Sequence, residues 1–390
     1  MLNVLAKKFR KPALMALTTF TALSLAGCGS TESSGSASGS KADTTHTEIS
    51  LYTGGSLNVK DFWEALIPKF EKEHPEIDVK LVFLPSGQGG QSTMDRLVAA
   101  KKAGKDSGVD IYEGAMSDIL RGEEEGGIFA KLDQSKVPNL EKVDKANLEG
   151  TKDYAVPYRS SSVVLAYNSE KVKAVPNTAD ELYAWIHKHP GRFAYNDPNT
   201  GGAGSSFVLT AVYNQLPSEA MNSQDASIMK EWDSGFKVLK KLAPDLYQKG
   251  VYPMKNQGTL DLLANEEVDM VPAWSDMALE QLNKKLLPDT IKLKQIQPAF
   301  TGGPAYLMIA ENKDEKRKVA AETLVDYVLT PEAQETVINK MYGYPGIKWE
   351  YLSGDLQKKF ESVSGGYRIF NGGDLDAELN KRWQKEIAGQ

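Results

Sequence analysis

From residue 48 onward, the chain alternates short stretches in which every second residue is apolar with longer stretches of helical spacing. Glu48–Thr53 (EISLYT) places Ile49 and Leu51 between polar neighbours, which predicts a half-buried strand. Asp61–His74 then repeats apolar residues at helical spacing, and Pro75 predicts the end of that helix. Because strand, loop and helix follow one another in this order, the pattern predicts an α/β architecture with largely parallel strands.

The same pattern continues along the chain. It predicts strands over residues 77–84 and 109–112 and helices over residues 92–102 and 116–125. The C-terminal part, Thr330–Gln390, is mostly helical by pattern. The body of the protein is therefore expected to repeat one strand, loop and helix unit before it ends in helices.

The first 27 residues have a different pattern. Four basic residues and no acid lie within residues 1–11, and residues 13–26 are almost wholly apolar or small. That order is typical of an export signal, and the apolar run is shorter than the roughly 20 residues that a membrane-spanning helix needs. Residues 28–46 that follow are rich in Ser, Gly and Thr, a composition that favours a flexible tether.

Cys28 is the only cysteine among the 390 residues, and it directly follows the apolar run. Leu25-Ala26-Gly27-Cys28 resembles the lipobox of bacterial lipoproteins, in which the signal is cut before the cysteine and that cysteine carries lipid. The resemblance implies a protein anchored to the outer face of the cytoplasmic membrane, either at the cell surface or in the periplasm. Two or more acyl chains on one residue suffice for lasting attachment. A buried or stray cysteine is the alternative.

Composition and motifs argue against several other classes. The net charge of -6 and the lack of clustered Lys and Arg argue against a nucleic-acid partner. The four histidines do not have the spacing of a zinc site, and the sequence contains no GxSxG, CxxC or P-loop motif. The sequence therefore predicts no catalytic residue, no metal site and no cofactor, and a cell-surface lipoprotein enzyme is kept only as a minor alternative.

Several stretches, in order, resemble the extracellular solute-binding proteins of bacterial ABC importers. They are LYTGGS followed by DFWEALIPKFEKEHPEIDVKLVF, then VDIYEGAMSDILRGEEEGGIFAKLD, YAVPYRSSSVVLAYNSEKVKAVPNTADEL and PAFTGGPAYLMIAENKDEKRKVAAETLVDYVLTPEAQE, which together extend from about residue 48 to residue 346. Within that family, HPGRFAYNDPNTGGAGSSF (residues 189–207) is most similar to receptors for iron, thiamine, polyamines, phosphonates and related small solutes.

The resemblance implies a bilobal fold of the type II periplasmic-binding-protein kind, with crossing strands near residues 158–167 and 296–309. Lobe 1 would contain residues 47–158 and 298–330, lobe 2 residues 159–297, and the helical segment 331–390 would pack across both. Such a protein, as a monomer, captures a small polar solute in the cleft by hinge closure and delivers it to a membrane permease. A module that feeds a membrane sensor is the alternative.

Candidate ligand-binding residues follow from the rule that open parallel sheets bind ligands at the carboxyl ends of their strands. Thr53, Gly54, Gly55 and Ser56 follow the first strand, although an ordinary tight turn explains them equally well. Residues 199–207 precede a helix predicted over residues 206–216. The candidates there, Gly202, Gly204, Ser205 and Ser206, suit an anion site at a helix N-terminus, or simply a flexible loop with a serine cap.

Trp274 and Asp276 follow the strand-like run of residues 268–272. Trp274 could stack on a ring or a cation, and Asp276 could accept hydrogen bonds, although core burial and helix capping explain both residues as well. Tyr112, Glu113 and Tyr158 are further candidates at strand ends in the first lobe. Trp274, Asp276 and Glu113 suit a sugar or an organic cation, the Gly-Ser helix terminus suits an organic anion, and a zwitterion would use both.

Overall fold

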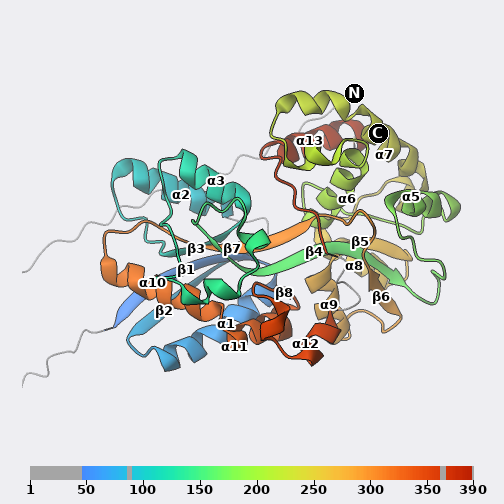
Figure 1. The fold of residues 1–390 in the computed structure, drawn as a ribbon. Helices are drawn as coiled ribbons and strands as arrows, with labels where there is room; N and C mark the ends of the chain where they lie inside the picture. The colour runs from blue at the N-terminus through green and yellow to red at the C-terminus, as the bar shows by residue number, and fades with distance from the viewer. Residues whose placement is uncertain (1–45, 86–89, 361–365, 389–390) are drawn as a thin grey trace, which may run out of the picture. The chain divides into compact units, whose positions relative to one another are not determined.

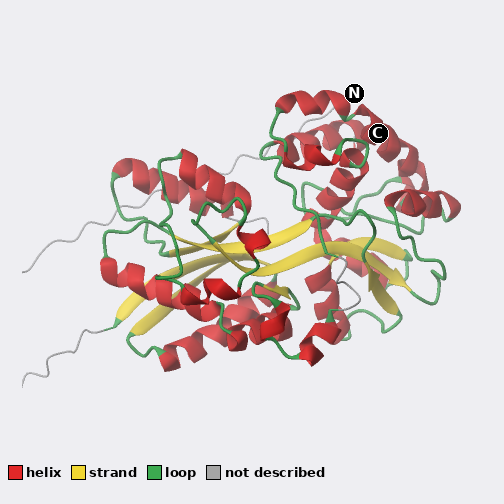
Figure 2. Cartoon of the chain, viewed as in Figure 1, coloured by secondary structure: helices red, strands yellow, loops and turns green. Residues whose placement is uncertain are grey.

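The computed structural model describes residues 46–85, 90–360 and 366–388, all within the unit Thr45–Gln390 (Figure 1). The predicted signal, Cys28 and the tether up to residue 45 lie outside the described residues. Figure 2 shows helices on both sides of a central set of strands, and this arrangement is the predicted α/β architecture.

Eight strands form one sheet in the order β2-β1-β3-β7-β4-β5, and β6 and β8 also pair with β4. The strands are β1 (Thr47–Gly55), β2 (Ile77–Pro85), β3 (Ile111–Gly114), β4 (Val156–Asn168), β5 (Met270–Trp274), β6 (Ile291–Lys294), β7 (Gly302–Ile309) and β8 (Tyr344–Pro345).

The expectation of largely parallel strands is wrong for most of this sheet. Among the pairs of strands within the described residues, β1 pairs in parallel with β2 and β3, whereas all pairs that involve β4 or β7 are antiparallel. The reason is that β4 carries the chain from the β1–β3 end of the sheet to the β5–β6 end, and β7 returns in the opposite direction. These two strands coincide with the predicted crossings near residues 158–167 and 296–309.

The helices cover both faces of the sheet. The α-helices are α1 (Leu57–Glu73), α2 (Gly90–Ala103), α3 (Met116–Glu124), α4 (Lys145–Leu148), α5 (Ala179–Lys188), α6 (Gly202–Tyr213), α7 (Asp233–Leu242), α8 (Lys255–Ala264), α9 (Ser275–Asn283), α10 (Glu315–Val328), α11 (Pro331–Thr336), α12 (Gly354–Lys359) and α13 (Leu375–Trp383). Short 3₁₀ segments are η1 (Pro138–Lys142), η2 (Ser218–Asn222), η3 (Ala226–Glu231), η4 (Ala243–Asp245), η5 (Tyr247–Lys249) and η7 (Trp349–Tyr351), and π turns are η6 (Val337–Met341) and η9 (Gln384–Ala388).

The elements predicted from the N-terminal half are confirmed. β2, β3, α2 and α3 lie within two residues of the predicted bounds, and α1 ends at Glu73 just before Pro75. The helical prediction for residues 330–390 is confirmed only in part. Between α12 and α13, the described residues 366–374 form an irregular segment. Gly372 and Gly373 lie at its end, just before α13.

The hydrophobic core divides differently on the two faces of the sheet. Side chains alternate along β4, where Val164 faces a core that extends along one whole face of the sheet and contains α1, α10 and α11, and Val163 faces the other side. On that other side the core is split. One cluster packs α2 and α3 on β3 and the end of β7, and a second packs α6, α7 and α13 near β5. Because the core on this face is split, a hollow lies between the two clusters.

Candidate functional site

A pocket of about 500 Å³ occupies the hollow between the two clusters. Ala115 and Met116, which follow β3, and Tyr306 of β7 line one side. The first turns of α6, the indole of Trp274 and two residues of α13 line the other, and Gly302–Pro304 at the start of β7 lie between them. The pocket is therefore built from both ends of the sheet.

Helix α6 begins at Gly202, one turn earlier than the predicted 206–216, so the glycines belong to a helix and not to a loop. This early start depends on close packing. A Cβ atom on Gly204 would lie only 1.9 Å from the backbone oxygen of Asn196, so no other residue allows the helix to approach so closely. Gly204 is buried and does not line the pocket, whereas Gly202 lies at the pocket wall beside Trp274.

The two serines of α6 line the pocket but already have partners. Ser205 Oγ donates to Oδ1 of Asp376 at 3.0 Å. Ser206 Oγ accepts from the backbone N–H of Thr301 at 3.0 Å and from its hydroxyl at 2.7 Å. The backbone N–H of Ala203 donates to Oδ1 of Asn256 at 3.0 Å. The helix terminus therefore has fewer free donors for an anion than the sequence suggests.

Trp274 and Asp276 separate in the structure. Trp274 ends β5 and lines the pocket. Asp276, in the first turn of α9, is buried and accepts from Ser161 Oγ at 2.7 Å and from Asn58 Nδ2 at 3.4 Å, and it is not among the residues lining this pocket. These bonds connect α9 to β4 and to α1, so Asp276 serves packing between elements.

The residues at the end of the first strand do not line this pocket. Thr53, Gly54 and Gly55 belong to β1, and Ser56 is the N-cap of α1, without a side-chain cap bond. Gly55 has a φ of 134°, a conformation that favours glycine. Thr53 follows Leu51 by two residues, so it lies on the face of the continuous core, opposite to the pocket.

Thr53, Glu113 and Tyr158 nevertheless come together, around Arg159. Arg159 Nη2 donates to Glu113 Oε1 at 2.9 Å and its Nε donates to the Tyr158 hydroxyl at 2.9 Å, while the Thr53 hydroxyl donates to the other oxygen of Glu113. The Glu113 and Arg159 side chains are 5% and 14% exposed. We call Thr53, Glu113, Tyr158 and Arg159 the arginine cluster.

Burial and charge shift the pKa values in the arginine cluster. Burial raises the pKa of the Tyr158 hydroxyl well above its ordinary value. Burial lowers the pKa of Arg159, but the neighbouring Tyr158 and Glu113 raise it by more, so the net shift is upward. Tyr112, the remaining candidate, is buried, and its ring stacks on Phe129 with centroids 6.3 Å apart; burial also raises its pKa. The cluster is a self-contained charged group.

Two pocket residues, Asp376 and Asn380 of α13, were not found from the sequence. Burial raises the pKa of the Asp376 carboxyl, and its hydrogen bond from Ser205 opposes that shift. Asn380 is 8% exposed, and its side-chain oxygen has no hydrogen-bond partner among the described residues. The sequence offered one sign that these two residues act together. They lie four positions apart in a segment predicted to be helical, so they share one helix face.

A larger hollow of about 940 Å³ adjoins the pocket and shares Met116 and Ile369 with it. Arg368 lines this hollow and donates to the backbone oxygen of Ala299 and to the Thr210 hydroxyl, at 2.5 and 3.4 Å. Burial lowers the pKa of Arg368, and no carboxylate within the described ranges forms an ion pair with it. The adjoining hollow therefore offers a guanidinium group, although Glu149 and Asp180 also line it.

The sequence and the fold were compared with those of known proteins. Residues 65–360 match the family model of the bacterial extracellular solute-binding proteins. The chain belongs to this family. No curated protein matches the sequence significantly. The predicted resemblance to the extracellular solute-binding family is thereby confirmed, and with it the expectation of a binding protein and not an enzyme.

Solved structures of other solute-binding proteins have the same fold at low identity. A Bordetella parapertussis protein described as extracellular solute-binding has a TM-score of 0.69 at 15% identity, covering 87% of this chain and 98% of that chain. Maltose-bound MalE3 of T. maritima has 0.69 at 14%, covering 87% and 95%. The spermidine/putrescine transporter protein PotD of Streptococcus pneumoniae has 0.66 at 16%, covering 87% and 99%. These likenesses confirm the α/β fold.

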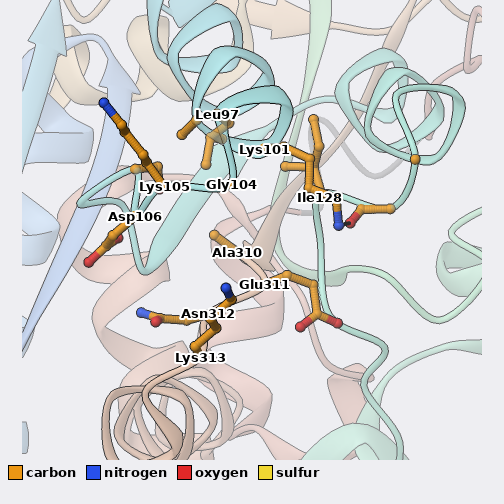
Figure 3. A pocket seen from close by; sticks show the side chains of 14 residues that line it. Leu97, Lys101, Gly104, Lys105, Asp106, Ile128, Ala310, Glu311, Asn312 and Lys313 are labelled. Atoms are coloured by element: carbon orange, nitrogen blue, oxygen red, sulfur yellow. Dashed lines mark hydrogen bonds between the residues drawn. The ribbon is translucent and has the colours of Figure 1, made fainter.

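This solute-binding protein has another pocket, of about 530 Å³, at the opposite ends of the same strands (Figure 3). It lies near the start of β3 and the end of β7, where Lys101, Lys105 and Lys313 accompany Asp106 and Glu311. Lys101 Nζ donates to the backbone oxygen of Gly127 at 2.9 Å. This pocket contains charges of both signs and lies on one half of the sheet only. The first pocket, in contrast, is lined by residues from both ends of the sheet.

Two further findings concern the part of the chain that the structure describes. No helix there is long and apolar enough to cross a bilayer. No group of three or more His, Cys, Asp or Glu side chains there is placed to hold a metal ion.

Proposed function

We propose that this solute-binding protein captures a small polar solute in the pocket between the end of β3 and the first turns of α6, and delivers it to the membrane permease of an ABC importer. The observation that supports this proposal is the split core. The face of the sheet that carries the pocket has separate hydrophobic clusters at its two ends, and residues from both ends line the space between them.

The same split supports two lobes that move relative to each other. In this proposal lobe 1 contains residues 47–158 and 298–330, lobe 2 contains residues 159–297, and the C-terminal segment 331–390 packs across both. β4 pairs with β7 through its first half and with β5 and β6 through its second, so it is the natural hinge. A solute touched by both lobes favours the closed form, because only there does it make all its contacts.

A thermal-shift screen of small polar solutes is the first test. A solute at 100 times its dissociation constant should stabilise the folded state by about 2.7 kcal/mol. Small-angle scattering with the best solute should then show a smaller radius of gyration, and an unchanged profile at saturation would contradict closure. Uptake of that solute by cells that contain the permease separates an importer from a sensor module.

Attachment to the membrane through Cys28 is the remaining part of the proposal, and the sequence pattern around this residue supports it. Cys28→Ser should yield protein that is released or keeps its signal, with unchanged solute affinity. Cell fractionation measures this. Variant protein that loses its signal and still sediments with membranes would refute lipid anchoring.

A further inference from the structure

We propose that Asp376 and Asn380 of α13 bind a protonated primary or secondary amine of the solute, so that the solute is an organic ammonium compound. This inference rests on the proposed function, in which the solute occupies the pocket that these two side chains line.

The first argument is the charge of the pocket lining. Asp376 is the only Asp, Glu, Lys, Arg or His among the described residues that line the pocket. No Lys, Arg or His within the described ranges forms an ion pair with Asp376. A half-buried carboxylate without a cation is unfavourable, and a cationic ligand would correct this.

The second argument is an unused acceptor beside that carboxylate. Asn380 lies one helical turn after Asp376, so both side chains share one face of α13. Asn380 is more than nine-tenths buried as a residue, and its side-chain oxygen receives no hydrogen bond from the described residues. A buried acceptor without a donor is costly. That oxygen is covered in this structure, and a half-turn of the amide presents it to the pocket, where an ammonium group would supply a donor to Asn380 and a charge to Asp376 together.

The third argument concerns the rest of the pocket wall. Two donors that an anion could use at the start of α6 are engaged, because the Ser205 hydroxyl donates to Asp376 and the backbone N–H of Ala203 donates to Asn256. Trp274 and Phe370 also line the pocket, and aromatic faces attract cations and methylene groups. The lining therefore favours a cation over an anion.

A structural role for Asp376 is the competing explanation. It lies in the first turn of α13, where a carboxylate stabilises the helix dipole, and its bond to Ser205 holds α13 against α6. Asp376→Asn separates the two roles, because the amide keeps an oxygen for Ser205 and removes the charge. Since burial already disfavours that charge, the variant should melt no lower than the wild type without solute.

The experiment measures binding of four classes of probe by calorimetry: putrescine and spermidine, 4-aminobutyrate and lysine, succinate and phosphate, and maltose and glucose. We expect binding among the amine-bearing probes, with or without a carboxylate, because the adjoining Arg368 hollow can receive an anionic end. Asp376→Asn should weaken that binding at least tenfold. The matched control, Glu378→Gln on the same helix, should leave it unchanged, because Glu378 pairs with Lys381 and does not line the pocket.

The outcomes separate this inference from the proposed function. Gly202→Val fills the pocket against Trp274 and should abolish binding of any probe that enters there. If only succinate, phosphate or a sugar binds, and Gly202→Val abolishes that binding, the pocket is correct and the amine assignment is overturned. Amine binding that Asp376→Asn leaves intact also overturns the assignment. Binding that survives Gly202→Val, or binding of none of the probes, overturns both.

Discussion

Two groups of polar side chains lie on opposite faces of the sheet, and they differ in where their partners come from. In the arginine cluster, Glu113 receives hydrogen bonds from Arg159 and from Thr53, and Arg159 also bonds Tyr158. In α13, Asp376 receives one bond from Ser205 and has no cation, and the Asn380 oxygen has no partner among the described residues. The sequence alone makes Glu113 look like the better ligand-binding candidate.

The difference shows that a buried polar residue is not by itself a sign of a binding site. When the partners of such a residue all belong to the protein, its bonds stabilise the fold. When a partner is missing, the residue is either an unfavourable feature of the fold or a group that a ligand completes. The arginine cluster is of the first kind, and the α13 pair is of the second, so substitutions in the two groups should affect different measurements.

The largest expected effect is on stability, in the arginine cluster. Arg159→Met leaves the Glu113 carboxylate buried without its cation and should lower the free energy of unfolding by about 3 to 5 kcal/mol, measured in urea. Adding Glu113→Gln to that variant should recover much of the loss. Lys60→Met breaks an exposed pair with Glu64 and serves as the control, with a much smaller change, because water screens exposed pairs. A loss as small as the control's would show that the cluster does not hold the fold.

The next effect compares two glycines of α6. Gly204→Ala places a methyl group against the Asn196 backbone and should cost about 3 kcal/mol of stability. Gly202→Ala should cost less, because its new methyl group meets the Trp274 ring at 3.0 Å and a side chain can shift. Thermal unfolding of the two variants measures this. Equal destabilisation would contradict the assignment of Gly204 to packing and Gly202 to the pocket wall.

Trp274 should behave as a pocket residue and not as a core residue. Trp274→Ala should weaken solute binding by about 1 to 3 kcal/mol and lower the stability of the solute-free protein by less. Calorimetry and urea unfolding measure the two quantities. A large loss of stability with normal affinity in the folded fraction would place the indole in the core.

The smallest effect is expected at an exposed residue whose partners are complete. Asp314 caps α10 and accepts from the backbone N–H groups of Lys316 and Arg317, at 3.0 and 3.3 Å. Asp314→Ala should cost about 1 kcal/mol of stability and leave solute affinity unchanged. A change in affinity would show that the pocket depends on the helices of the far face.

The sequence allowed most of the first half of the fold to be predicted, because β1, α1 and β2 have clear periodicity and Pro75 marks a boundary. The sequence-based prediction was wrong at the start of α6, because Gly-Gly-Ala-Gly has the local propensity of a loop. The helix forms there because packing on Asn196 and Asn256 outweighs that propensity.

The candidate site could be predicted only in part, since local patterns do not report distant partners. Gly202, Ser205, Ser206 and Trp274 line one pocket, but the residue that engages Ser205 is 171 positions away. Glu113 and Arg159 are likewise far apart in the sequence and pair only in the folded protein. No local pattern distinguishes a carboxylate that will find an arginine from one that will not.

The antiparallel pairing of β3 with β7 also bears on how the chain acquires its structure. Ile111 lies opposite Ile309, so the β1–β3 end of the sheet stays incomplete until the chain has been made beyond residue 302, where β7 begins. Contacts between residues so far apart in sequence slow folding. Until β7 arrives, β3 has an unpaired edge that is open to strands of other chains. We therefore expect fragments that end before residue 302 to aggregate.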